Sequence, residues 1–127
     1  MFEKLELVRM AQAMARHAGA RTDVIARNVA NSDTPGYRAR DLPDFESYAE
    51  GKTGLRGTRA GHLRSAAAVA AEPVPVGIMG TASPNGNSVS LEEEMVKAVS
   101  ARQQHEMALS IYQSSSRLIR TSLGRSS

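Results

Sequence analysis

The bulky apolar residues of this chain are concentrated at its two ends. Of the 30 Val, Ile, Leu, Met and Phe residues, 10 lie in residues 1–30 and 11 in residues 89–127, which leaves nine for the 58 residues between them. Material for a hydrophobic core is therefore present in the two terminal segments and sparse in the middle.

In residues 1–31 the apolar positions recur at spacings of three, four and seven. A repeat that averages 3.5 residues is typical of a helix that packs along another helix. The positions on this predicted seam are Leu7, Ala11, Met14, Ala18, Ile25 and Val29, with Thr22 in the remaining place. The segment predicts an N-terminal helix that is roughly 40 Å long, at about 1.5 Å per residue.

Residues 89–124 predict a second long helix. Ser90 followed by Glu93 is the pattern of a capping box, and Gly124 offers a C-terminal stop. Two adjacent apolar lines run along it: Met95, Ala98, Leu109, Tyr112, Ile119 and Leu123 form the first, and Val96, Met107, Ile111 and Leu118 form the second. Leu109 and Ile111 are two residues apart and so point about 200° apart around the helix. We assign the Leu109 line to the N-terminal helix and the Ile111 line to a neighbouring subunit.

Between the helices we expect a turn with an extended segment (32–50) and a flexible or irregular insert (51–88) that contains seven of the ten glycines. Thr34–Tyr37 has Pro35 at its second position and Gly36 at its third, which predicts a type II turn with a positive φ at Gly36. Asn31 is expected to end the first helix in the left-handed conformation, and Asn28 to hydrogen-bond to backbone groups around the last turn.

These elements predict a mainly α, elongated, antiparallel pair of terminal helices in a single domain spanning residues 1–127. Leu, Ile, Val and Phe number only 24, which is few for a chain of 127 residues. We therefore expect partner molecules to complete the core, and a purified monomer that is partly disordered. The chain has no cysteine, no run of about 20 apolar residues, and no basic-then-apolar order of a secretory signal at its start.

No constellation of residues indicates catalysis, a cofactor site or a metal site. His17, His62 and His105 are scattered, and Leu109 stands where the HExxH motif starting at His105 requires its second histidine. We interpret Glu92–Glu94 as charges on the solvated start of a helix. From a different functional class, a small basic DNA-binding architectural protein is the alternative. The net charge of only +3 and the mixture of acidic and basic residues on both helices argue against it.

Two blocks of this sequence resemble the flagellar basal-body rod proteins. "NVANSDTPGYRARDLPDF", from Asn28 to Phe45, is similar to their first signature, and "SPNGNSVSLEEEMVKAV", from Ser83 to Val99, resembles the second block of the proximal rod proteins of FlgB type. The neighbouring proximal rod protein of FlgC type shares the first block and is the alternative within the family. The signature positions are Asn28, Asn31, Thr34, Pro35, Gly36, Tyr37, Gly86, Asn87, Leu91 and Met95.

The resemblance implies a structural, non-enzymatic component of the rod, the drive shaft of the flagellum. It implies assembly with other copies, with other rod proteins and with the basal-body ring or rod adaptor, and no nucleic acid or small-molecule substrate. It also implies export through the flagellar type III apparatus without a cleaved signal, into a rod that spans the periplasm. The signature residues would shape the turn and lock subunits together. The residues expected to serve helix pairing and assembly are Leu7, Met14, Ile25, Met95, Leu109, Ile111, Tyr112 and Leu118.

Overall fold

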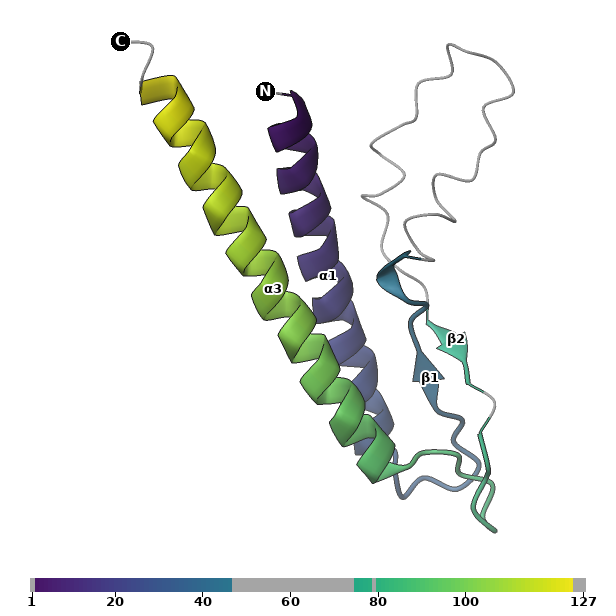
Figure 1. The fold of residues 1–127 in the computed structure, drawn as a ribbon. Coiled ribbons are helices and arrows are strands. Elements are labelled where there is room, and N and C mark those ends of the chain that lie inside the picture. Colours follow the sequence, from purple (N-terminus) through teal and green to yellow (C-terminus); the bar gives the residue numbers. More distant parts are fainter. Residues whose placement is uncertain (1, 47–74, 79, 125–127) are drawn as a thin grey trace, which may run out of the picture.

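The computed structural model describes residues 2–46, 75–78 and 80–124. Two long helices dominate it, α1 (Phe2–Ala30) and α3 (Leu91–Gly124), and they run antiparallel with both chain termini at the same end (Figure 1). The predicted fold class is confirmed, and each helix boundary lies within two residues of the predicted one. Of the expected insert at residues 51–88, residues 51–74 and 79 lie outside the described residues.

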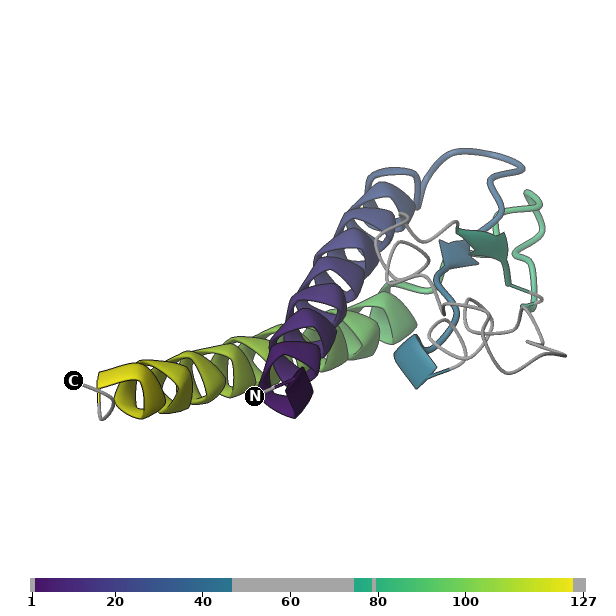
Figure 2. The same ribbon diagram turned by 90° about the horizontal axis from the view of Figure 1, so that it is seen from above.

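Small residues form the contact between the helices. Ala11 and Ala18 of α1 are buried, as are Ala101 and Ala108 of α3, and each pair is seven residues apart. A seven-residue repeat keeps one face of each helix against its partner, and alanine lets the two backbones approach closely. Seen from above, the helices cross one another rather than lying side by side over their whole length (Figure 2). Ile25 extends this buried line toward the end of α1.

The prediction of which apolar line of α3 faces α1 is wrong. Leu109, on the line assigned to α1, is 42% exposed, and Met95 on the same line is 69% exposed. The buried residues of α3 instead follow a line between the two apolar ones: Glu94, Ala101, Ala108 and Ser115. Ile111, expected to face outward, is half-buried beside this line. The prediction followed the bulky side chains, whereas close packing of two helices favours the small ones.

On α1 the outcome is mixed. Ile25 is buried and Met14 half-buried, in agreement with the predicted seam, but Leu7 and Val29 are exposed. Both exposed positions lie toward the ends of the helix. Buried residues thus follow the central part of the predicted seam, and its ends present apolar side chains to the surroundings.

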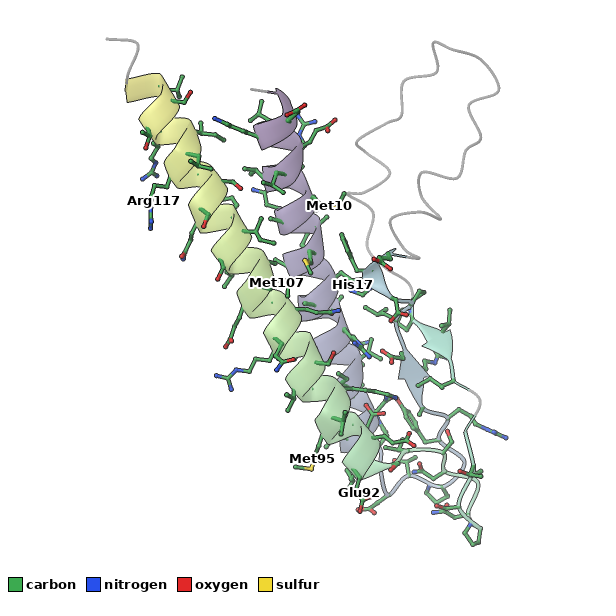
Figure 3. All side chains as sticks on the ribbon, in the orientation of Figure 1. Met10, His17, Glu92, Met95, Met107 and Arg117 are labelled. Atoms are coloured by element: carbon green, nitrogen blue, oxygen red, sulfur yellow. The ribbon has the colours of Figure 1, made fainter. Side chains whose placement is uncertain are left out.

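A second face of α1 packs against the chain that follows the turn at Thr34–Tyr37, which we call the corner. Segment 37–46 returns along α1, and its strand β1 (Arg40–Asp41) pairs antiparallel with β2 (Val76–Gly77), Arg40 opposite Gly77. His17, on the side of α1 that faces this segment, is buried and its Nε2–H donates to the Pro43 carbonyl at 2.7 Å (Figure 3). The ring of Phe45 packs edge-on against the imidazole. One helix therefore buries two faces, one against α3 and one against its own return segment.

Candidate functional site

The turn after α1 has the predicted geometry. The Tyr37 N–H donates to the Thr34 carbonyl at 3.2 Å, and Gly36 has a φ of 76°. With Pro35 at the second position, these are the features of a type II turn. The Gly36 N–H donates to the carbonyl of Asn85, 3.0 Å away, outside the turn itself. The corner is thus joined to the segment that precedes α3.

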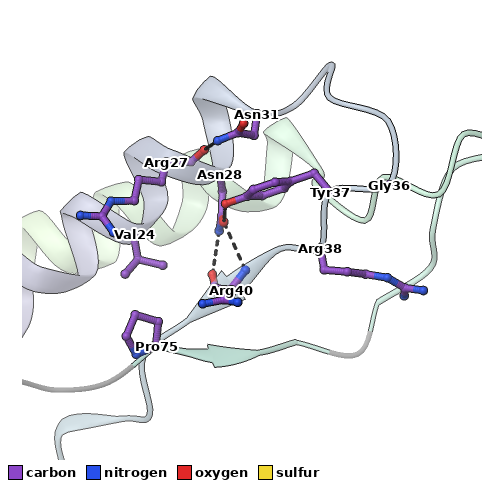
Figure 4. Close-up of a pocket in the computed structure, with 9 residues that line it drawn as sticks. All are labelled: Val24, Arg27, Asn28, Asn31, Gly36, Tyr37, Arg38, Arg40 and Pro75. Carbon is purple, nitrogen blue, oxygen red and sulfur yellow. Dashed lines mark hydrogen bonds between the residues drawn. The ribbon is translucent and has the colours of Figure 1, made fainter.

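Asn31 ends α1 in a different way from the one predicted. Among the described residues only glycines have positive φ, so Asn31 is not left-handed. Its side-chain Nδ2 donates to the Arg27 carbonyl at 2.8 Å (Figure 4). Its Oδ1 accepts from the hydroxyl of Thr34. The asparagine therefore satisfies a terminal carbonyl with its side chain, and the left-handed position is needed only later, at Gly36.

Asn87 connects the two signature blocks. Its side chain is buried, and its Nδ2 group lies 2.8–2.9 Å from three carbonyl oxygens, those of Asn31, Ser32 and Thr34. Its Oδ1 accepts the N–H of Val89. An amide side chain offers both donors and an acceptor, which a carboxylate or a hydrocarbon cannot do. The residue holds the exit of α1 against the entry of α3.

The two positive-φ glycines lie against one another. Gly86 has a φ of 84°, and a Cβ built on it would come within 3.4 Å of the Gly36 Cα. Glycine is therefore favoured at 86 by the backbone conformation, and a side chain there would contact the other loop. The sequence singled out both glycines but did not indicate that they lie against each other.

Asn28 does more than the predicted capping of its own helix. The side chain is fully buried, its Nδ2 donates to the Arg40 carbonyl at 2.7 Å, and its Oδ1 accepts the Arg40 N–H at 3.2 Å (Figure 4). The hydroxyl of Tyr37 also donates to Oδ1. The bonds that we predicted to the last turn of α1 go instead to strand β1. The asparagine pairs with this backbone as a neighbouring strand would.

A chain of charged side chains joins α1, β1 and α3. Arg21 binds Asp41 through two nitrogen–oxygen contacts of 3.1 and 3.3 Å, and Lys97 lies between Asp41 (3.9 Å) and Glu94 (3.3 Å). Glu94 also accepts from Asn28 Nδ2 at 3.2 Å. The two cations and two anions balance, so each buried charge has an opposite charge nearby.

This network corrects the interpretation of Glu92–Glu94 as a uniformly solvated helix start. Glu94 is 1% exposed and belongs to the interior, whereas Glu92 and Glu93 are exposed. The signal in the sequence was the seven-residue spacing from Glu94 to Ala101 and Ala108, which places the glutamate on the buried line.

The buried line of α3, formed by Glu94, Ala101, Ala108 and Ser115, is the seam of this helix. Two apolar flanks border it, one on each side. The Met95 flank contains Leu91, Met95, Leu109, Tyr112 and Leu123, and the Met107 flank contains Val96, Met107 and Leu118. All eight are exposed, and Met95 points away from α1 (Figure 3). On α1, Leu5, Leu7 and Met10 are exposed near the start of the helix. Soluble monomers rarely expose so many large apolar side chains on one element.

A basic depression of about 480 Å³ lies beside the corner. Its floor is formed by Val24, Asn28, Asn31, Gly36, Tyr37 and Pro75, and its rim by Arg27, Arg38 and Arg40. We call it the arginine pocket. Arg27 and Arg38 extend to opposite sides with Arg40 between them (Figure 4). Arg27 pairs with Asp23 at 2.9 Å, and within the described ranges Arg38 and Arg40 take part in no ion pair.

The described part of the chain holds no group of three His, Cys, Asp or Glu side chains placed to share a metal ion. Neither of its long helices has the length and hydropathy that a membrane span requires. The features that stand out are thus a cross-linked corner, an arginine pocket and unusually apolar helix flanks.

Comparison with known proteins finds one family. The sequence model described as "Flagella basal body rod protein" matches residues 11–38, which run from the seam of α1 through the corner. The chain is 28% identical over 123 residues to flagellar basal body rod protein FlgB of Agrobacterium fabrum, covering 92% of both chains. It is 30% identical to FlgB of Escherichia coli K12, covering 87% of this chain and 88% of the relative. FlgB of Salmonella typhimurium is 28% identical over 124 residues.

Proposed function

Because this chain belongs to the flagellar basal body rod proteins and is of FlgB type, it is a structural component of the flagellar rod, and we propose that it assembles there through the apolar flanks of α1 and α3. The observation that carries the proposal is the position of the flanks. They lie on both sides of the α1–α3 seam and are exposed. A helix pair with apolar surface on two sides can bury it only between two neighbours.

The neighbours that we propose are further copies of this chain, other rod proteins and the adaptor between rod and ring. Membership of the family supports a location in the basal body, and we infer export by the flagellar type III apparatus into the periplasm-spanning rod. The role is structural rather than enzymatic. The alternatives of FlgC type and of a DNA-binding protein are not favoured, because the curated relatives matched over most of the chain are FlgB proteins.

The proposal is tested by one charged substitution on each flank, Leu109→Asp and Leu118→Asp, in a strain without its own copy of the gene. Each removes an aliphatic contact of about 1.5–3 kcal/mol and adds the cost of burying a charge at the subunit interface. Both side chains are exposed in the isolated chain. We therefore expect circular dichroism spectra like that of the unsubstituted protein, but loss of swimming and absence from purified basal bodies.

Gln113→Asp is the matched control, because Gln113 is an exposed polar residue of the same helix. It should swim normally. Normal swimming of one flank variant would show that this flank is not packed in the rod, and normal swimming of both would refute assembly through the flanks.

A further inference from the structure

The arginine pocket and the exposed glutamates at the start of α3 have complementary charges. Glu92 and Glu93 are exposed and, within the described ranges, form no ion pair, as is also true of Arg38 and Arg40. Beside the glutamates lies Leu91, half of whose side-chain surface is exposed. We call residues 91–93 the acidic turn. It carries two carboxylates, and the pocket carries three arginines around a floor that is partly polar (Asn28, Asn31) and partly apolar (Val24, Pro75).

The two features lie on opposite sides of the helix pair. Arg27, on the rim of the pocket, is two residues after the seam residue Ile25 and so lies about 200° around α1 from the seam. Glu92 is two residues before the buried Glu94 and lies equally far around α3. One chain therefore cannot fill its own pocket with its own acidic turn.

The two features also lie at the same end of the molecule. The Asn28 side chain, beneath the pocket, donates to Glu94, one residue beyond the acidic turn, across 3.2 Å. A contact between the pocket of one molecule and the acidic turn of another would join the two side by side at the same level. Such a contact uses two different surfaces, so it can repeat from copy to copy and generate a ring or a helical array.

We propose that the arginine pocket receives the acidic turn of a second copy of this chain, with Glu92 against Arg38 and Arg40. This rests on the proposed assembly into the rod and specifies one of its contacts. A single exposed ion pair contributes little, but several charges at one contact act together and fix the register of the partner.

Cross-linking in assembled rods tests which surfaces meet. The chain has no cysteine, so single cysteines can be placed at will. Two differently tagged copies, one with Arg40→Cys and one with Glu92→Cys, are produced together in a deletion strain, and their basal bodies are treated with a short bis-maleimide. When an Arg and a Glu side chain form an ion pair, their Cβ atoms are too far apart for cysteines at the same positions to form a disulfide. A cross-linker that spans the gap is therefore used. We expect a cross-linked dimer that carries both tags.

Glu6→Cys replaces Glu92→Cys in the control, because Glu6 is an exposed glutamate in the first turns of α1, at the other end of the molecule. Basal bodies that contain both variants and give no Arg40–Glu92 dimer overturn the pocket contact while leaving rod assembly intact. A dimer with Glu6 instead, or a cross-link to another rod protein alone, also overturns it. Absence of both variants from basal bodies that the unsubstituted chain enters would show that both surfaces are needed in the rod, whereas absence of the unsubstituted chain itself would count against the proposed function.

Charge exchange decides whether the occupant is a copy of the same chain. We expect Arg38→Glu with Arg40→Glu to lower incorporation into basal bodies about tenfold, and Glu92→Lys with Glu93→Lys to do the same. When all four substitutions are in one chain, every pocket is acidic and every turn basic, so incorporation should recover. A fourfold variant that is no better than either double variant, despite an unchanged circular dichroism spectrum, would show that the pocket binds something else.

Discussion

At the corner, Gly36 and Gly86 both have positive φ. A Cβ on Gly36 has nothing within 4 Å, and one on Gly86 would lie at ordinary contact distance, 3.4 Å, from the Gly36 Cα. The cost of alanine is therefore conformational at both positions.

We expect Gly36→Ala and Gly86→Ala each to lower the free energy of unfolding by about 1–2 kcal/mol, the cost of a left-handed residue with a Cβ. Urea unfolding followed by circular dichroism measures both. Gly19→Ala, inside α1 where φ is not positive, is the matched control and should raise stability by about 0.5–1 kcal/mol. Equal effects at 19 and 36 would exclude strain as the reason for glycine at the turn.

A second prediction at this scale concerns the buried amide of Asn87. Asn87→Ala leaves the carbonyls of Asn31, Ser32 and Thr34 without their shared donor, and we expect a loss of about 1–3 kcal/mol. Asn87→Asp should be worse, because a carboxylate oxygen would replace the donor against three carbonyl oxygens. The urea midpoints of both variants are compared with that of Gln103→Ala, an exposed position on α3. If aspartate is tolerated better than alanine, the amide is not the donor that joins the two segments.

At the scale of the helices, the seam depends on the size of Ala108, which is fully buried. Ala108→Leu inserts three carbons where the backbones are close, and we expect a loss of about 1–3 kcal/mol. Ser110→Leu adds the same side chain at an exposed position and should change stability by less than about 0.5 kcal/mol. Thermal unfolding of the two variants distinguishes a tight seam from a loose one, since a loose seam would accept the leucine at 108 or gain stability from it.

The sequence predicted the existence and ends of α1 and α3, because their periodicity and punctuation are local. The turn at Pro35–Gly36 was predictable for the same reason, since φ there depends on two adjacent residues. The seam of α3 was not, because alanine carries little hydrophobic signal although its small size is what close packing selects. Nor were the distant partners of Asn28 and Asn87, such as Arg40, Glu94 and Asn31, which lie 12 to 66 residues away along the chain. A pattern along the sequence can indicate which residue caps a helix. It does not indicate which distant backbone group a side chain will bind.

At the scale of the whole molecule, the interior formed by residues 2–46, 75–78 and 80–124 is small. Six of the nine buried hydrophobic residues in these ranges are alanines; the others are Val24, Ile25 and Leu42. Alanine buries little apolar area, and the stabilisation from burial is about 25 cal/mol per Å². The larger apolar side chains are the ones left on the flanks of the helices. The isolated chain should therefore have a stable part only where the seam, the corner and the charged network coincide.

We expect hydrogen exchange of the isolated chain to vary along α3. The amides of residues 95–108 should be protected, because Glu94, Ala101 and Ala108 are held against α1. Those of residues 117–124 should exchange fast, because the last buried residue of the helix is Ser115 and Leu118 and Leu123 are exposed. Local opening requires little free energy where few apolar contacts are broken. In purified basal bodies the same C-terminal amides should become protected, since neighbouring subunits would cover the flanks. Uniform protection along α3 in the isolated chain would mean that the helix pair is complete by itself, and that its apolar flanks are not what assembly stabilises.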